Sequence, residues 1–338
     1  MSSHSGLTIE NLSIAFEGGD KVAVHGVSLR VPMGEAVGLV GESGSGKSLT
    51  SRAALGLLPK QSVVNGQISV GEYAILGMSA RQLRAVRGAG IAMVFQDPMS
   101  SLNPVARVGD LITQVIRSHG AVSESEAVAR AVGLMERVGI RDAKARSTSY
   151  PHEFSGGMRQ RIMIAMALAA KPAVLVADEP TTALDVIVQK NILTLLDDLC
   201  REEGMGLLLV AHDLAVVASL CSRIAVMYAG QIVEEGPTKD ILMRSRMPYT
   251  VGLLASTRRD KSVARLMSIP GSPPLLGDRA KGCRFAPRCP LAVEACRAGP
   301  VSLAEVTPGH KARCIRAADV PRMNLESFSR LQPEAVHG

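Results

Sequence analysis

The chain of 338 residues is long enough for one large domain with a smaller one, or for two ordinary domains. Apolar residues make up 46% and charged residues 20%, the balance of a globular protein. The net charge of +7 favours an anionic partner such as a nucleotide, a nucleic acid or an acidic membrane, although dispersed surface charge gives the same total. Aromatic residues make up only 3%, without Trp, which argues against base-stacking platforms for single-stranded nucleic acid. With the motifs described next, no nucleic-acid partner is expected.

The first twenty residues lack a basic start followed by an apolar stretch, so no signal peptide is expected. No span of about 20 apolar residues occurs either. The protein is therefore expected to be soluble by itself, with any membrane role exerted through a partner.

The N-terminal part predicts a hairpin and then a strand that leads into a helix. Residues 7–16 and 21–31 alternate apolar and polar side chains around Glu17-Gly18-Gly19-Asp20, which is typical of an antiparallel hairpin. The apolar run 36–40 predicts a strand, and a Gly-rich loop separates it from a helix at about 47–57. Further strands are expected within 67–74 and at 91–95.

The middle of the chain has a helical pattern, which predicts a helical subdomain at about 97–160. Beyond it, short apolar strands alternate with helices up to residue 228, which predicts a buried parallel sheet in an α/β fold. The expected helices are 108–119, 124–138, 155–170, 186–201 and 214–220, and the expected strands are 173–177, 206–211 and 223–228. The texture changes near Met247, so the predicted division is 1–247 for a nucleotide-binding domain and 248–338 for a small, irregular C-terminal domain.

The segment Gly41-Glu42-Ser43-Gly44-Ser45-Gly46-Lys47-Ser48 matches the phosphate-loop pattern and lies between a predicted strand and a predicted helix. Its glycines let backbone N–H groups surround phosphate oxygens, and the helix adds its positive N-terminal end. Lys47 would reach the β- and γ-phosphates and Ser48 would bind Mg²⁺. The candidate nucleotide-binding residues of this segment are Gly41, Ser43, Gly44, Ser45, Gly46, Lys47, Ser48 and Leu49.

The apolar run 173–177 ends in two carboxylates, Asp178 and Glu179. The end of a strand is where an open α/β sheet presents its ligand site. Beside a phosphate loop, Asp178 would hold Mg²⁺ and Glu179 would polarise the attacking water as general base.

Between these two motifs lies Phe154-Ser155-Gly156-Gly157-Met158-Arg159-Gln160-Arg161. This segment resembles the signature L-S-G-G-Q of the ATP-binding subunits of ABC transporters, with Phe in place of Leu and Met in place of Gln. The resemblance implies that Ser155, Gly156 and Gly157 contact phosphate. It also implies a P-loop NTPase core with an antiparallel β subdomain and a helical insertion.

Other elements resemble that family in the same order. Gln96 has the position of the glutamine loop, which senses Mg²⁺ and the membrane partner, and Thr181-Thr182-Ala183-Leu184-Asp185 resembles the D-loop. His212 resembles the switch histidine that contacts the γ-phosphate, and Phe16 fits the aromatic residue that stacks on adenine. The resemblance thus implies Glu179, His212 and Gln96 as catalytic residues, and Ser48, Gln96 and Asp178 around Mg²⁺.

The resemblance also implies partners. Two nucleotide-binding domains close head to tail, and each ATP is held by the phosphate loop of one and the Ser-Gly-Gly segment of the other. Because this chain has single copies of the motifs, it needs a second ATPase subunit, expected to be a different protein. Two transmembrane permease subunits and an extracytoplasmic peptide-binding protein complete the expected set, with this chain peripheral at the cytoplasmic face of the inner membrane.

Further details resemble the oligopeptide/dipeptide importer branch, which includes nickel importers. They are Tyr150-Pro151-His152-Glu153 before the signature, Pro248-Tyr249-Thr250, and Ile269-Pro270-Gly271-Ser272-Pro273-Pro274. The expected function is ATP hydrolysis that energises peptide uptake, with nickel or another small solute as the alternative. A soluble ABC ATPase would usually carry two nucleotide domains or long coiled-coil arms. Intact Lys47 and Glu179 argue against a decayed ATPase that only binds metal.

Cys283, Cys289, Cys296 and Cys314 crowd into a short C-terminal stretch. Without a secretory signal, a metal site is preferred over disulfides, and four thiolates suit either a [4Fe–4S] cluster or structural Zn²⁺. The importer branch carries an iron–sulfur cluster on such cysteines, so the resemblance favours the cluster, with zinc or free thiols as alternatives. The expected role is structural, tethering a domain too small to build its own core.

Overall fold

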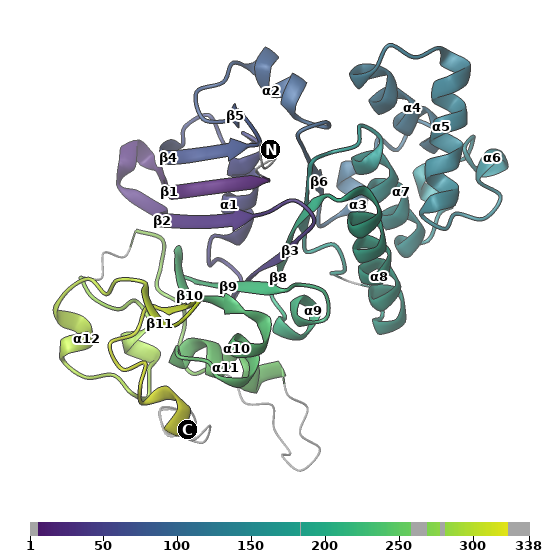
Figure 1. Ribbon diagram of the computed structural model, residues 1–338. Helices are drawn as coiled ribbons and strands as arrows, with labels where there is room; N and C mark the ends of the chain where they lie inside the picture. The colour runs from purple at the N-terminus through teal and green to yellow at the C-terminus, as the bar shows by residue number, and fades with distance from the viewer. Residues whose placement is uncertain (1–5, 183, 258–268, 278–280, 324–338) are drawn as a thin grey trace, which may run out of the picture.

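A computed structural model describes residues 6–182, 184–257, 269–277 and 281–323 (Figure 1). The centre of the described part is a sheet of eight strands. Five of them are parallel, in the spatial order β9 (Arg223–Tyr228), β3 (Ala36–Val40), β8 (Gly206–Ala211), β7 (Val174–Asp178) and β6 (Ile91–Val94). Every residue of β6, β7 and β8 is buried, because helices and a second sheet cover both faces. The predicted parallel sheet is therefore confirmed.

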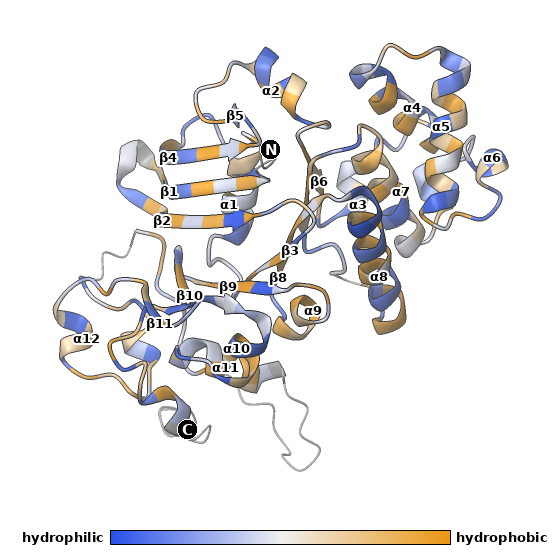
Figure 2. Ribbon diagram, viewed as in Figure 1, coloured by the Kyte–Doolittle hydropathy of each residue, from blue (hydrophilic) through white to orange (hydrophobic). Residues whose placement is uncertain are grey.

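The second sheet is antiparallel and has the order β2 (Lys21–Val31), β1 (Leu7–Phe16), β4 (Val63–Val70) and β5 (Tyr73–Ala74). Figure 2 shows alternating hydrophobic and hydrophilic bands along its longer strands, as expected for a sheet with one buried face. That face shares a core with α1 (Lys47–Ala54), α2 (Ala80–Val86) and one side of the large sheet. The predicted hairpin is confirmed by the pairing of Leu7 with Val31 and Phe16 with Lys21.

The helices of the middle segment pack together beside the other face of the large sheet (Figure 1). They are α3 (Pro98–Ser101), α4 (Val108–His119), α5 (Glu124–Arg137), α6 (Ala143–Arg146) and α7 (Gly156–Leu168). Ser123 and Ser155 begin α5 and α7 by accepting hydrogen bonds from backbone N–H groups of the first turn. α8 (Val186–Glu203) and α9 (Leu214–Ala218) complete this core.

The C-terminal segment extends the large sheet. β10 (Gln231–Pro237) is antiparallel to β9, β12 (His310–Ala312) pairs with β10, and β11 (Ala304–Thr307) pairs with β12. The ring of Phe285 lies 5.3 Å from that of Tyr228 and 5.4 Å from that of Tyr249, inside the larger hydrophobic core. The remaining elements of this part are α10 (Thr238–Met243), α11 (Pro248–Thr257), α12 (Ala295–Ala298) and the single turns Ala286–Arg288 and Val320–Arg322.

Several helix ends differ from the prediction, among them those of the helices expected at 155–170 and 186–201, which end at Leu168 and Glu203. The helix expected at 47–57 ends at Ala54, because Gly56 takes a left-handed conformation (φ 64°) that terminates the hydrogen-bond ladder. The helix expected at 214–220 ends at Ala218. In the described ranges, no helix is both long and apolar enough to cross a lipid bilayer.

Candidate functional site

The phosphate-loop segment forms the turn between β3 and α1 (Figure 1). A Cβ atom on Gly41 would lie 2.1 Å from the carbonyl oxygen of Met227, so only glycine fits there. Gly46, the residue before α1, has a φ of 102°. The hydroxyl of Ser45 is buried and has no hydrogen-bond partner in the described structure. The first N–H groups of α1 likewise have no partner within the helix, so this turn offers several donors to an anion.

Lys47 lies inside this turn, with 4% of its surface exposed. Its ammonium donates hydrogen bonds to the carbonyl oxygens of Gly41 (2.8 Å) and Glu42 (3.0 Å). Burial lowers the pKa of Lys47, an effect that the nearby carboxylates of Glu179, Asp178 and Glu42 oppose. The ammonium is thus largely removed from water and held by weak neutral acceptors, which phosphate oxygens can replace.

Ser48 and Asp178 face each other across the start of α1 and the end of β7. The hydroxyl of Ser48 donates to Oδ1 of Asp178 over 3.1 Å, and Asp178 is 2% exposed. Burial raises the pKa of the Asp178 carboxyl, and the hydrogen bond from Ser48 partly offsets this. A buried carboxylate beside a hydroxyl is a donor set that suits a small hard cation such as Mg²⁺.

The carboxylate of Glu179 collects polar groups from the ends of three adjacent strands. Its Oε2 accepts hydrogen bonds from Nε2 of Gln96 (3.1 Å) and Oγ1 of Thr182 (3.0 Å), and lies 3.5 Å from Nδ1 of His212. Glu179 has a φ of 48°, a conformation that costs free energy for a residue with a side chain and is often found at functional sites. The structure therefore brings together the three residues predicted as catalytic, beside the phosphate loop.

Thr182 is a partner of Glu179 that the sequence analysis did not identify. It follows Glu179 by three residues in a turn closed by a hydrogen bond from the N–H of Thr182 to the carbonyl of Glu179. The spacing within Asp178-Glu179-Pro180-Thr181-Thr182 is the signal that could have identified it.

The Ser-Gly-Gly segment and the D-loop residue form a second group at the N-termini of α7 and α8. Ser155 caps α7, and Asp185 caps α8 by accepting from the N–H groups of Ile187 and Val188. A Cβ on Gly157 would meet Val188 at 2.7 Å, so the two helix starts pack together. Gly156 lies beside Leu184, and Ala183 lies outside the described residues. Among the residues with described positions, no hydrogen bond or ion pair joins this group to the phosphate loop.

Phe16 and Leu49 have less distinctive surroundings. Both are partly buried and pack against the core of the smaller sheet, Phe16 at the end of β1 and Leu49 in the first turn of α1. Ser43 and Gly44, at the tip of the phosphate loop, are exposed.

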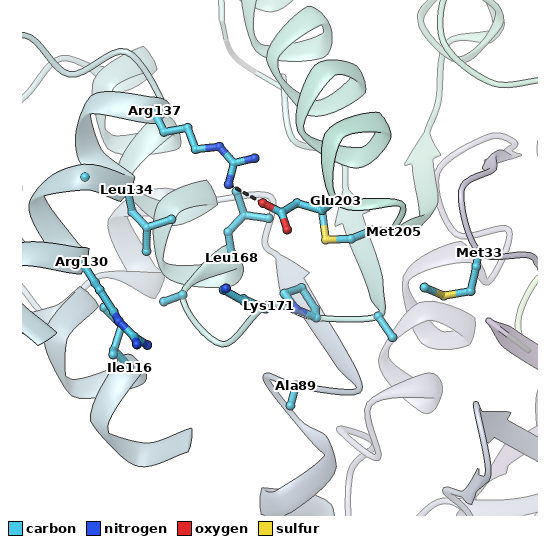
Figure 3. A pocket seen from close by; sticks show the side chains of 14 residues that line it. Met33, Ala89, Ile116, Arg130, Leu134, Arg137, Leu168, Lys171, Glu203 and Met205 are labelled. Carbon is cyan, nitrogen blue, oxygen red and sulfur yellow. Dashed lines mark hydrogen bonds and ion pairs between the residues drawn. The ribbon is translucent and has the colours of Figure 1, made fainter. Parts of the chain in front are cut away.

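A cavity of about 540 Å³ lies elsewhere, between the helical middle segment and the large sheet (Figure 3). Its lining includes Ala89, Ala173 and Met205, which lie one or two residues before β6, β7 and β8. The phosphate loop, Glu179 and His212 follow the carboxyl ends of parallel strands. The cavity is therefore at the opposite edge of the sheet from the predicted site.

The four C-terminal cysteines converge, but they do not form a ready-made metal centre. All four line one small cavity, together with Phe285 and Met247. Its volume of about 10 Å³ is about that needed for one water molecule. Burial raises the pKa of the thiols of Cys289 and Cys314 to about 12 and about 11. In the described residues, no three His, Cys, Asp or Glu side chains are arranged to hold a metal ion. The predicted metal-binding C-terminal domain is therefore not supported by the structure.

Comparison with known proteins places both the phosphate-loop part of the chain and its C-terminal part in transporter families. Residues 24–182 match the ABC transporter family, and residues 233–296 match the oligopeptide/dipeptide transporter C-terminal region. A probable peptide ABC transporter ATP-binding protein of Sinorhizobium fredii is 47% identical over 93% of this chain and 96% of that protein. The oligopeptide transport ATP-binding protein OppD of Salmonella typhimurium is 44% identical over 93% of this chain and 94% of that protein.

The fold is also shared with solved structures. A dimeric ATP-binding cassette in a post-hydrolysis state, bound to ADP and phosphate, superimposes with a TM-score of 0.61 at 27% identity, covering 69% of this chain and 98% of the other. The arrangement of mixed sheet, phosphate loop and helices is thus that of an ABC ATPase. On this sequence identity over nearly the full length of its relatives, the chain belongs to the ATP-binding subunits of ABC transporters, in the oligopeptide/dipeptide branch.

Proposed function

We propose that this chain binds and hydrolyses ATP and thereby energises the import of peptides through membrane-embedded partners. The observation that carries the hydrolytic part is the carboxylate of Glu179, held by Gln96 and Thr182 within 3.1 Å and close to His212, beside the phosphate loop. The peptide part rests on relatives named as peptide and oligopeptide transport proteins, at 44% to 47% identity.

The residues support the following division of roles. The N–H groups of the loop and Lys47 would bind the β- and γ-phosphates, with Lys47 exchanging the carbonyl oxygens of Gly41 and Glu42 for phosphate oxygens. Ser48 and Asp178 would hold Mg²⁺, which neutralises charge on the phosphate oxygens when bound. Glu179 would orient a water molecule and take its proton, while His212, more than half exposed, would reach the γ-phosphate.

The Ser-Gly-Gly group completes the proposal for a two-subunit site. Ser155, Gly156 and Gly157 lie at a helix start, where N–H groups suit phosphate, yet in the described part of the chain no hydrogen bond or ion pair joins them to the phosphate loop. We therefore propose that they serve the ATP bound to a second ATPase subunit, as a head-to-tail dimer requires. Two permease subunits, a peptide-binding protein outside the membrane and a peripheral position at its cytoplasmic face complete the proposed assembly.

Glu179→Gln tests the hydrolytic assignment. The amide keeps the size and a hydrogen-bond acceptor but cannot take a proton, so Mg²⁺-ATP should bind while turnover falls by about 10²-fold or more. Glu202→Gln, which alters a carboxylate that pairs with Arg137 on the surface, is the matched control and should retain activity. Hydrolysis by Glu179→Gln at the parental rate would exclude Glu179 as the base.

For the cysteines we propose that Cys283, Cys289, Cys296 and Cys314 together hold a [4Fe–4S] cluster, with Zn²⁺ as the alternative. Support comes from the four thiols lining one cavity and from the fit of a four-thiolate donor set to either group. The cavity between the thiols, about 10 Å³, is smaller than a cluster, so the cysteine side chains would have to move apart to hold one. Protein purified without oxygen should contain about four iron atoms per chain and be brown. Colourless protein with stoichiometric zinc would favour the alternative.

A further inference from the structure

The C-terminal segment contacts the phosphate loop directly, through Glu42. The guanidinium of Arg288 donates to both carboxylate oxygens of Glu42, over 2.8 Å to Oε2 and 3.0 Å to Oε1. Glu42 is the second residue of the loop and Arg288 is 246 positions away in sequence. Such a two-point pair fixes both distance and orientation, which a single contact between charges does not.

Arg288 is itself held rigidly. Its side chain is 5% exposed, Nε donates to the carbonyl of Pro270 (2.9 Å), and a terminal nitrogen donates to the carbonyl of Ile269 (3.2 Å). A further contact reaches the hydroxyl of Tyr228 at 3.3 Å. Because the guanidinium already has these partners, its position does not depend on Glu42 alone.

Every polar group of Glu42 is engaged. Its N–H donates to the hydroxyl of Tyr249 (2.8 Å), its carbonyl accepts from Lys47 (3.0 Å), and its carboxylate accepts from Arg288. Two of these three partners, Tyr249 and Arg288, come from the segment after residue 247, and neither was predicted to have a role.

We infer that Arg288 is a positioning residue for ATP binding, which acts on the phosphate loop through Glu42. This inference rests on the proposed binding of ATP by this chain. Two effects follow from the geometry. Arg288 fixes the first turn of the loop, so that the N–H groups after Glu42 keep their direction. It also neutralises a carboxylate that would otherwise repel a triphosphate in the same loop.

Measuring the affinity for a fluorescent ATP analogue with Mg²⁺ tests this inference. Arg288→Ala should weaken binding by about tenfold or more, because it leaves Glu42 charged and unpaired beside the phosphates. The affinity of Arg288→Lys should lie between those of the parental chain and Arg288→Ala, since an ammonium restores the charge without the two-point geometry. The double variant Arg288→Ala with Glu42→Gln should recover part of the loss, because the repelling charge is gone.

A matched control is Arg313→Ala. Arg313 lies in the same segment and donates to the carbonyl oxygens of Ile232 and Val301, without contacting the phosphate loop. It should leave the affinity for the analogue unchanged, which separates a general loss of C-terminal structure from an effect on the loop. In steady-state assays, Arg288→Ala should raise the KM for ATP much more than it lowers kcat.

The outcomes distinguish this inference from the proposed function. If the parental chain does not bind the analogue, the proposed function fails. If the parental chain binds and folded Arg288→Ala binds equally well, the inference about Arg288 is wrong. Equal loss in Arg313→Ala, or no recovery in the double variant, also overturns it. Should Arg288→Ala not fold, as judged by circular dichroism, Arg288→Lys decides the question, because parental affinity in that variant contradicts the need for two-point geometry.

Discussion

Replacing Phe285 by Ala should destabilise the whole chain, not only its C-terminal segment. Phe285 is 1% exposed and packs edge-on against Tyr228 of β9 and Tyr249 of α11. Removing a buried Phe side chain costs about 3–5 kcal/mol, through lost burial and the cavity that remains. Because Tyr228 belongs to β9 of the large sheet, the substitution should lower the free energy of unfolding of that sheet and not only of the C-terminal segment.

Urea unfolding followed by two signals measures this effect. Circular dichroism reports the helices and strands. Tyrosine fluorescence, free of Trp emission because the chain has no Trp, reports its four Tyr, of which Tyr228 and Tyr249 contact Phe285. The dependence of the free energy of unfolding on urea is about 3 kcal/mol per molar or somewhat more for a chain of this size, so both midpoints should fall together by roughly 1 M. Phe285→Leu, which leaves a smaller cavity than Ala, should cost less than Phe285→Ala. Leu275→Ala, at a side chain that is 84% exposed, should cost less than about 0.5 kcal/mol.

A separate response of the two signals would refute this reasoning. If Phe285→Ala left the circular dichroism midpoint unchanged while the tyrosine signal changed at lower urea, the C-terminal segment would unfold by itself. That result would support 248–338 as a domain with its own stability.

Three more changes have defined expectations. Gly41→Ala should weaken ATP binding by about tenfold or more, because the added Cβ would overlap the carbonyl of Met227; equilibrium binding measures this, and parental affinity would show that the loop can shift without cost. Asp178→Asn should raise the free energy of unfolding at pH 7 without Mg²⁺ by more than about 0.5 kcal/mol, since burial raises the pKa of this carboxyl. The gain should disappear below about pH 4, where the Asp178 side chain of the parental chain is protonated and as neutral as the Asn of the variant. A gain independent of pH would show that the buried charge is not its cause. Burial, aided by the charge of Arg284, lowers the pKa of His25 to about 4, so the fold favours neutral His25. The parental chain should therefore lose stability relative to His25→Gln as the pH falls from about 6.5 toward about 4, in urea titrations at each pH, and parallel curves would refute it.

The parts of the fold and site that could be predicted are those encoded in short stretches of sequence. The continuous apolar runs of β6, β7 and β8 predicted buried parallel strands, and the carboxyl ends of such strands lie at one edge of a sheet. That rule predicts one edge for the residues that follow these strands, and the resemblance to ABC ATPases assigned Gln96 and His212 to the same site as Glu179. The structure then added the distances and the partner Thr182.

The parts that could not be predicted depend on contacts between distant residues. No local sequence pattern pairs Glu42 with Arg288, because charged residues of both types are mostly found at the surface, where they need no particular partner. Strands β11 and β12 are only four and three residues long and have too few positions to show an alternating pattern. Their attachment to β10, and hence the continuity of the large sheet, follows from pairing and not from local propensity.

The attachment of β12 to β10 also has a consequence for the behaviour of shortened chains. A chain ending near residue 247 would keep the phosphate loop, Glu179 and His212, but the outer N–H and C=O groups of β10 would lose their partner strand. Glu234 of β10, fully buried, would lose the ring of His310 that now lies 2.8 Å away. Unpaired strand edges readily join those of other copies, so such a chain is expected to self-associate. In the described structure the strand at this edge of the sheet is β11, short and mostly exposed, which offers little edge for that association.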